Sequence, residues 1–123
     1  MTDRRGFFFR PMVLEESPDS ALSHDEELFG PVGVLLQAES PDAAVAIANR
    51  SKYGLGATVY SERPEIVERA ADRLEAGFVH VNTRPGLHPS IPFGGVKASG
   101  FGRDCGDAGF LEYTASKAII GAE

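Results

Sequence analysis

Residues 32–81 read VGVLLQAESPDAAVAIANRSKYGLGATVYSERPEIVERAADRLEAGFVHV, and the predicted fold depends on this stretch. It contains three short apolar runs bounded by polar or turn-forming residues, which is typical of buried strands. Two segments with helical character separate these runs. The expected strands are Val32–Leu36, Gly56–Tyr60 and Phe78–Val81. The order strand, helix, strand, helix, strand predicts an α/β fold: a parallel-sheet βαβαβ unit with right-handed crossovers.

Both helices carry sequence signals at their ends. The first helix is expected from Asp42 to Asn49, because Ser40 can serve as its N-cap and Pro41 suits a first turn. The second helix is expected to begin with Pro64 and to stop before Gly77, since glycine often terminates a helix. Its apolar stripe follows helical spacing and consists of Ile66, Val67, Ala70, Ala71 and Leu74.

Apolar segments also lie near both ends of the chain. Met12–Leu14 is a candidate strand, and Phe7–Phe9 would place aromatic rings on both faces of any strand. The tail from Tyr113 to Ile120 is a candidate last strand with an apolar edge at its end. Edges of this kind commonly pair with another chain.

The stretch Ile91–Gly106 holds five glycines in sixteen residues, which excludes a regular helix or strand. Two phenylalanines, a lysine and an arginine distinguish it from a flexible linker, so we expect an ordered loop. Its spacing matches neither the phosphate-binding P-loop nor the dinucleotide fingerprint. It belongs to a longer span, Asn82–Cys105, without a periodic element, and such long loops usually have a function.

Composition excludes several classes of function. The chain has 123 residues, 42% of them hydrophobic, and a net charge of -6, which argues against a nucleic-acid partner. Its single cysteine excludes an intramolecular disulfide and a cysteine-based zinc cluster. No apolar run approaches eighteen residues and no signal peptide is recognised, so no membrane span and a cytoplasmic location are expected.

No metal site is predicted. The acidic segment Glu15–Glu27 lacks the ligand spacing of a calcium loop and is expected to be a solvated surface. His24, His80 and His88 have no metal-like spacing either. His80 is expected on the less buried face of its strand.

Several motifs in order give the chain a family resemblance. From Gly6 onward it resembles the C-terminal part of the catalytic domain of the aldehyde dehydrogenase superfamily, including semialdehyde and aromatic-aldehyde dehydrogenases. The motifs that carry the resemblance are Glu26–Val32 (EELFGPV), Ala48–Leu55 (ANRSKYGL), Glu75–Asn82 (EAGFVHVN), Pro92–Lys97 with Ser99–Arg103 (PFGGVK and SGFGR), and Tyr113-Thr114 with Lys117. The resemblance implies half of a catalytic domain in residues 1–111 and an oligomerisation strand in residues 112–123.

The resemblance also implies a reaction. Such enzymes oxidise an aldehyde to a carboxylic acid and pass a hydride to NAD or NADP. A cysteine thiolate attacks the carbonyl, and a water activated by a glutamate later hydrolyses the thioester. The nucleophile, the base and the dinucleotide domain all precede the window that this chain matches, so the chain is expected to contain no catalytic residue.

Some residue roles carry over by resemblance. Glu27 would accept hydrogen bonds from the nicotinamide ribose hydroxyls, and Phe29 would pack beside the nicotinamide ring. Phe93 would line the aldehyde pocket. Asp104 stands where the family usually has glutamate, and Cys105 follows it at a non-catalytic position, where a buried, inert thiol is expected.

The loop before Pro92 falls where the family builds its substrate entrance. Arg84 and His88 lie in this loop, and Arg84 would suit an aldehyde that carries a carboxylate, such as a semialdehyde.

Three readings of the chain as a whole follow from the resemblance. The first is a truncated C-terminal segment of an aldehyde dehydrogenase that is inactive alone and binds the dinucleotide weakly or not at all. The second is a non-catalytic interaction module that docks with a separately encoded N-terminal half or with a full-length relative. As partners, the resemblance implies a homo-oligomer or a complementing N-terminal half. The third is a nonfunctional gene remnant.

Overall fold

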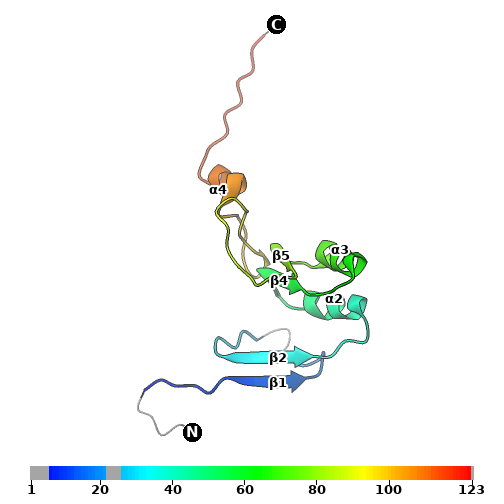
Figure 1. Cartoon of the computed structure of the whole chain (residues 1–123). Helices are drawn as coiled ribbons and strands as arrows, with labels where there is room; N and C mark the ends of the chain where they lie inside the picture. Colours follow the sequence, from blue (N-terminus) through cyan, green and yellow to red (C-terminus); the bar gives the residue numbers. More distant parts are fainter. Residues whose placement is uncertain (1–5, 22–25, 123) are drawn as a thin grey trace. The chain divides into compact units, whose positions relative to one another are not determined.

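The computed structural model describes residues 6–21 and 26–122 of the chain (Figure 1). The chain divides into two compact units, Met1–Lys52 and Tyr53–Glu123. Each unit has its own pair of parallel strands. His24 and Asp25 fall outside the described residues.

The first unit contains the parallel strands β1 (Met12–Glu16) and β2 (Val32–Leu36), drawn side by side in Figure 1. Their register runs from Met12 opposite Val32 to Glu16 opposite Leu36. Burial alternates along β2, because successive side chains of a strand point to opposite faces. Both strands lie where the sequence predicts them.

Helix α2 (Pro41–Asn49) follows β2 and confirms its predicted N-cap. The Ser40 hydroxyl accepts a hydrogen bond from the Ala43 N–H at 3.1 Å, which satisfies one of the free donors of the first turn. Just beyond the helix, the Arg50 guanidinium pairs with the Asp19 carboxylate at 2.8 Å. This exposed pair connects the end of α2 to the segment after β1.

The second unit contains the parallel strands β4 (Gly56–Val59) and β5 (Phe78–Val81), joined by helix α3 (Pro64–Arg73). Helix α3 contacts both strands, and its Ala70 is only 6% exposed. The other members of the predicted apolar stripe are half-buried, so the stripe faces the strands as expected.

The prediction of parallel strands is confirmed, but the prediction of one three-stranded sheet is wrong. The parallel hydrogen-bonded pairs are β1 with β2 and β4 with β5, in separate sheets. The partner of β2 is Met12–Glu16, a segment that precedes the βαβαβ stretch.

The predicted end of the second helix is also wrong. Helix α3 stops at Arg73, because Leu74 adopts an extended backbone with ψ 125°. Gly77 does not cap this helix. Its N–H donates to the carbonyls of Gly54 and Leu55 at 3.0 and 3.1 Å, and a Cβ atom there would overlap the Gly94 carbonyl.

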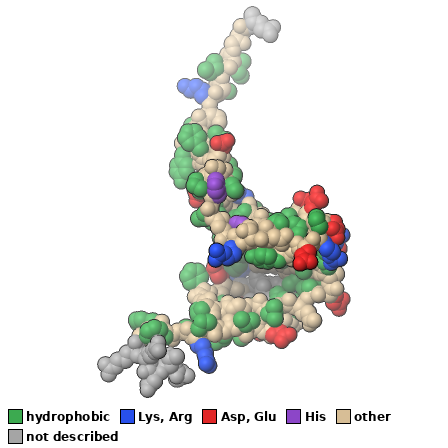
Figure 2. Space-filling view, viewed as in Figure 1, with side chains coloured by type: hydrophobic (Ala, Val, Ile, Leu, Met, Phe, Trp, Pro, Cys, Tyr) green, Lys and Arg blue, Asp and Glu red, His purple; other side chains and the backbone are tan. Residues whose placement is uncertain are grey.

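The last part of the chain differs most from expectation. Helix α4 (Gly106–Glu112) was not predicted, and residues 114–122 form no strand in the described structure. The apolar tail is exposed, with Ile119 at 89% and Ile120 at 94%, and Figure 2 shows hydrophobic side chains along it. Phe7–Phe9 are exposed as well. None of the helices in the described residues is long and apolar enough to cross a membrane.

Replacing Gly77 with alanine is expected to destabilise the chain. The added methyl group meets a backbone carbonyl, which cannot rotate away, so we expect a loss of about 1–3 kcal/mol in the free energy of unfolding, measured by urea denaturation. Gly86→Ala is the matched control, because nothing lies within 4 Å of its Cβ position. Equal midpoints for the two variants would contradict the close approach at Gly77.

Candidate functional site

The glycine-rich loop Ile91–Gly106 is ordered, as the sequence predicts. Phe93 and Asp104 pair as an antiparallel bridge, with each N–H donating to the other's carbonyl at 2.7 Å. The short strand β6 (Val96–Lys97) pairs antiparallel with β3 (Tyr53–Gly54). The loop is therefore closed on itself at one point and attached to the start of the second unit at another.

Side chains of the loop reinforce this backbone pairing. The Ser99 hydroxyl accepts from the Gly54 N–H at 3.0 Å, and Arg103 donates from Nη1 to the carbonyls of Gly95 and Gly102 at 2.9 and 2.7 Å. Lys97 Nζ lies 2.7 Å from Glu75 Oε2. These polar side chains therefore hold the backbone of the loop in its observed conformation.

Phe93 lies at the centre of this arrangement. Its ring packs against the Phe78 ring of β5, with the two centroids 5.2 Å apart. Two hollows share Phe93 as a wall. The smaller, of about 130 Å³, is lined by Phe78, Val79, His80, Gly86, Leu87, His88, Ile91, Pro92 and Phe93. The larger, of about 380 Å³, is lined by residues of the glycine loop together with Leu55, Glu112 and Tyr113.

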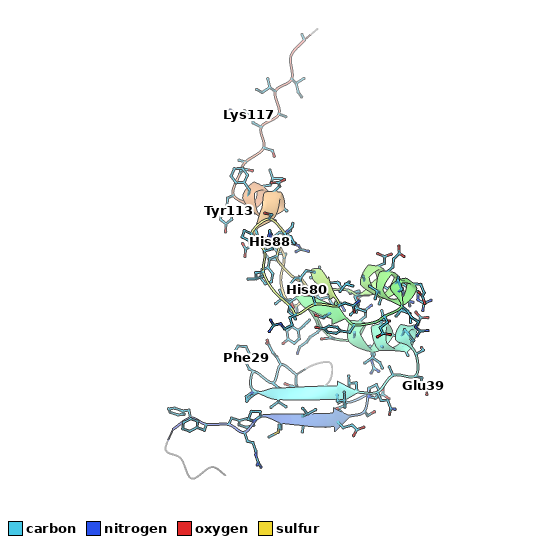
Figure 3. All side chains as sticks on the ribbon, in the orientation of Figure 1. Phe29, Glu39, His80, His88, Tyr113 and Lys117 are labelled. Carbon is cyan, nitrogen blue, oxygen red and sulfur yellow. The ribbon has the colours of Figure 1, made fainter. Side chains whose placement is uncertain are left out.

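Glu27 and Phe29 lie in the first unit, on the segment that leads into β2. Both side chains are exposed, Phe29 at 92%, and Phe29 has a positive φ of 45° (Figure 3). The backbone next to them is held to β1, because Met12 N–H donates to the Pro31 carbonyl at 3.0 Å. Phe93 belongs to the second unit.

Asp104 and Cys105 connect the loop to α4. Asp104 is exposed, and its backbone takes part in the bridge to Phe93. The expectation of a buried Cys105 is wrong: the residue is exposed and has φ 61°. The cause is the sharp turn into α4, where the neighbouring Gly106, and not Cys105, packs against Pro92 and donates its N–H to the Pro89 carbonyl at 2.8 Å.

Two residues at the end of β5 have structural contacts that sequence reasoning missed. His80 is half-buried, its ring lies edge-on to Phe78, and its Nε2 lies 3.1 Å from both the N–H nitrogen and the carbonyl oxygen of Gly86. Asn82 has φ 51°, and its side chain bonds both the N–H and the carbonyl of Ser61 at 2.9 Å. An asparagine directly after a predicted strand could have indicated this turn, because asparagine adopts a positive φ more readily than most residues.

The arrangement offers an aromatic wall, an adjoining apolar hollow and a rigid backbone. These are the features of a small-molecule subsite, in which apolar walls give shape and few polar groups give orientation. Among the residues that the structure describes, no group of three or more His, Cys, Asp or Glu side chains could hold a metal ion.

Comparison with known proteins extends this description. The family profile described as "Aldehyde dehydrogenase family" matches residues 1–119. Among curated relatives, the succinate-semialdehyde dehydrogenase (NADP(+)) of Deinococcus radiodurans is 43% identical over 114 residues, an alignment that covers 93% of this chain and 24% of that protein.

Solved structures agree with the sequence relatives. Betaine aldehyde dehydrogenase from Staphylococcus aureus, in complex with NAD+, matches with a TM-score of 0.85 and 36% identity over 91% of this chain and 22% of the other. Succinic semialdehyde dehydrogenase from Streptococcus pyogenes, in complex with NADP+, matches with a TM-score of 0.86 and 32% identity over 94% and 26%.

The chain spans about a quarter of the length of these relatives. The match nevertheless includes nearly every residue of the chain, in both sequence and backbone. The chain belongs to the aldehyde dehydrogenase family.

Proposed function

We propose that the chain forms the C-terminal part of the catalytic domain of an NAD(P)+-dependent aldehyde dehydrogenase. The overall reaction converts an aldehyde, water and NAD(P)+ into a carboxylic acid, NAD(P)H and a proton. The observation that carries the proposal is the family match over residues 1–119 together with an ordered glycine loop that presents Phe93 beside a hollow. A single cysteine favours a reducing compartment, so the proposed location is the cytoplasm.

The proposed cofactor contacts are Glu27 and Phe29. Their exposure supports the assignment, because a free carboxylate can accept hydrogen bonds from two ribose hydroxyls and a free ring can pack against a flat nicotinamide. NAD(P)+ supplies the hydride acceptor, and these residues would position it. The pyrophosphate-binding surface lies elsewhere in the proposed enzyme, so this chain alone binds the dinucleotide weakly at best.

The proposed substrate is a small semialdehyde. Two observations support this class: Arg84 is exposed on the loop before Phe93, and several relatives are succinate-semialdehyde dehydrogenases. Guanidinium groups bind carboxylates with paired, charge-assisted hydrogen bonds. Phe93 would contact the carbon chain of the aldehyde, while Arg84 would hold its distant carboxylate.

A second candidate function is that of an interaction module. Exposed apolar residues support it: Phe7–Phe9 near one end, Phe110 and Leu111 on α4, and Ile119-Ile120 in the tail. These surfaces suit a complementing N-terminal half or another copy of the chain. In this proposal the tail 112–123 becomes a strand only when it pairs with a partner.

In the proposed enzyme the catalytic residues lie outside this chain. This division of roles predicts that activity appears when the chain is complemented by the other part. The chain alone is expected to show no aldehyde-dependent formation of NAD(P)H. Turnover is expected when it is mixed with the Deinococcus radiodurans relative truncated before the matched region. Cys105→Ala in this chain should leave that turnover unchanged, because Cys105 is not the proposed nucleophile. Turnover by the chain alone would overturn the division of roles, whereas binding without turnover would favour the interaction module.

Glu27→Gln is expected to weaken cofactor binding in the complemented enzyme. The neutral amide loses charge-assisted hydrogen bonds to the ribose, so KM for NAD(P)+ should rise about 10-fold or more. The control is Glu26→Gln, which changes a neighbouring exposed carboxylate without a proposed role. Equal effects of the two substitutions on KM would count against a specific ribose contact.

Arg84→Gln tests the substrate class. We expect KM for succinate semialdehyde to rise about 10-fold, because the carboxylate loses its charged partner, while KM for butanal stays within about twofold. Arg84→Lys should recover part of the loss. Parallel increases in KM for both aldehydes would show that Arg84 does not bind the carboxylate.

A further inference from the structure

The geometry points to His80 as a positioning residue that fixes the loop forming one wall of the hollow beside Phe93. The ring reaches from β5 to Gly86 and ties the middle of residues 82–92 to the strand. This inference uses the proposed function only to name the ligand, the carbon chain of the aldehyde. The contact itself can be tested on the chain alone.

Burial does not hold this loop in place. All side chains from Asn82 to Pro92 are exposed, including Leu87 at 69% and Ile91 at 58%. Exposed loops with little apolar contact open easily, with low local free energies. The position of the loop therefore depends on its few polar contacts with the rest of the unit.

Asn82 is hydrogen-bonded to Ser61, and beyond it three hydrogen-bonded contacts attach residues 83–92 to other parts of the second unit. At its start, the Tyr60 hydroxyl donates to the Thr83 carbonyl at 2.8 Å. At its end, the Pro89 carbonyl accepts from the Gly106 N–H at 2.8 Å. Between them, His80 holds Gly86 at 3.1 Å. The first two contacts lie six residues apart, so without His80 the segment between them has no described side-chain attachment to β5.

The His80 ring is itself held at a defined position. It packs edge-on against Phe78, with centroids 5.2 Å apart and an interplanar angle of 87°, and Phe78 in turn packs against Phe93. Both neutral tautomers connect the ring to Gly86, since Nε2 can accept from the N–H or donate to the carbonyl. Three rings in successive contact thus connect the loop to the residue proposed to contact the aldehyde.

The consequence concerns the smaller hollow. Its volume of about 130 Å³ is lined by rings of β5 and by Leu87, Ile91 and Pro92 of the loop. Figure 3 shows His80 at the strands of the second unit and His88 closer to α4. When Gly86 is held, Leu87 stays beside Phe93 and the hollow keeps its shape. His80 therefore determines the fit of the substrate chain without touching the reacting carbon.

Backbone dynamics of the full chain test the contact directly. A glutamine at position 80 places its amide near the position of Nε2, whereas an asparagine reaches only near Nδ1. His80→Asn is expected to lower the NMR order parameters of Gly86 and Leu87 from about 0.85 to below about 0.6, and His80→Gln is expected to retain them. His88→Asn is the matched control, because the described contacts of its ring are within the loop.

Order parameters at Gly86 that are equal in the wild type and in His80→Asn would overturn the inference. If the NMR signals of residues in α3 and β4 are the same in all variants, general unfolding is excluded as the cause of a lower order parameter at Gly86. Loss of order in both His80→Asn and His80→Gln, without rescue, would also overturn it, since the amide of glutamine would then not replace Nε2.

Kinetics in the complemented enzyme test the consequence for the substrate. His80→Asn should raise KM for the aldehyde about 10-fold with kcat within about twofold, and His80→Gln should restore KM. A decrease in kcat with unchanged KM would overturn the role in substrate fit. Absence of turnover with the wild-type chain would contradict the proposed function instead, and the order parameters would still decide whether His80 holds the loop.

Discussion

The second unit depends on one close approach of two backbones, at Gly77 and Gly94. The Gly77 N–H bonds to the carbonyls of Gly54 and Leu55, and the space where a side chain would stand is filled by the Gly94 carbonyl. Three segments that are distant in sequence therefore meet at a single residue. Phe78 and Phe93 each adjoin one of the two contacting glycines, so the backbone contact also brings their rings together.

The chain buries little of its apolar surface by itself. Val45 and Ala70 are its buried hydrophobic side chains among the described residues, while many large ones are exposed. Single exposed hydrophobic residues are ordinary, but grouped ones on α4 and the tail form a surface that a partner can cover. Because a small core gives little stability, any association that covers this apolar surface would stabilise the chain.

Local signals predicted the elements that depend on local physics. Helix α2 begins where Ser40 caps it, and the stripe of α3 faces the strands, because both follow from spacing along the chain. Sequence reasoning failed where contacts between distant residues determine the structure. Gly77 resembles a helix cap, but it lies against Gly94. Cys105 is exposed because Gly106 packs in its place. The assignment of Phe93 to the aldehyde pocket comes from the family resemblance and stays a prediction, whereas the contact of His80 required its distance to Gly86.

The backbone contact at Gly77 and Gly94 and the exposed loop before Phe93 tolerate amino-acid substitution to different degrees. Substitutions at Gly77 or Gly94 meet backbone atoms and disturb the whole unit. Substitutions in residues 83–92 alter exposed side chains, which usually changes stability by less than about 0.5 kcal/mol. The glycine framework can thus stay fixed while the loop that faces the hollow varies. A loop held by a few polar contacts is therefore the part of this unit where sequence can change at least cost to folding.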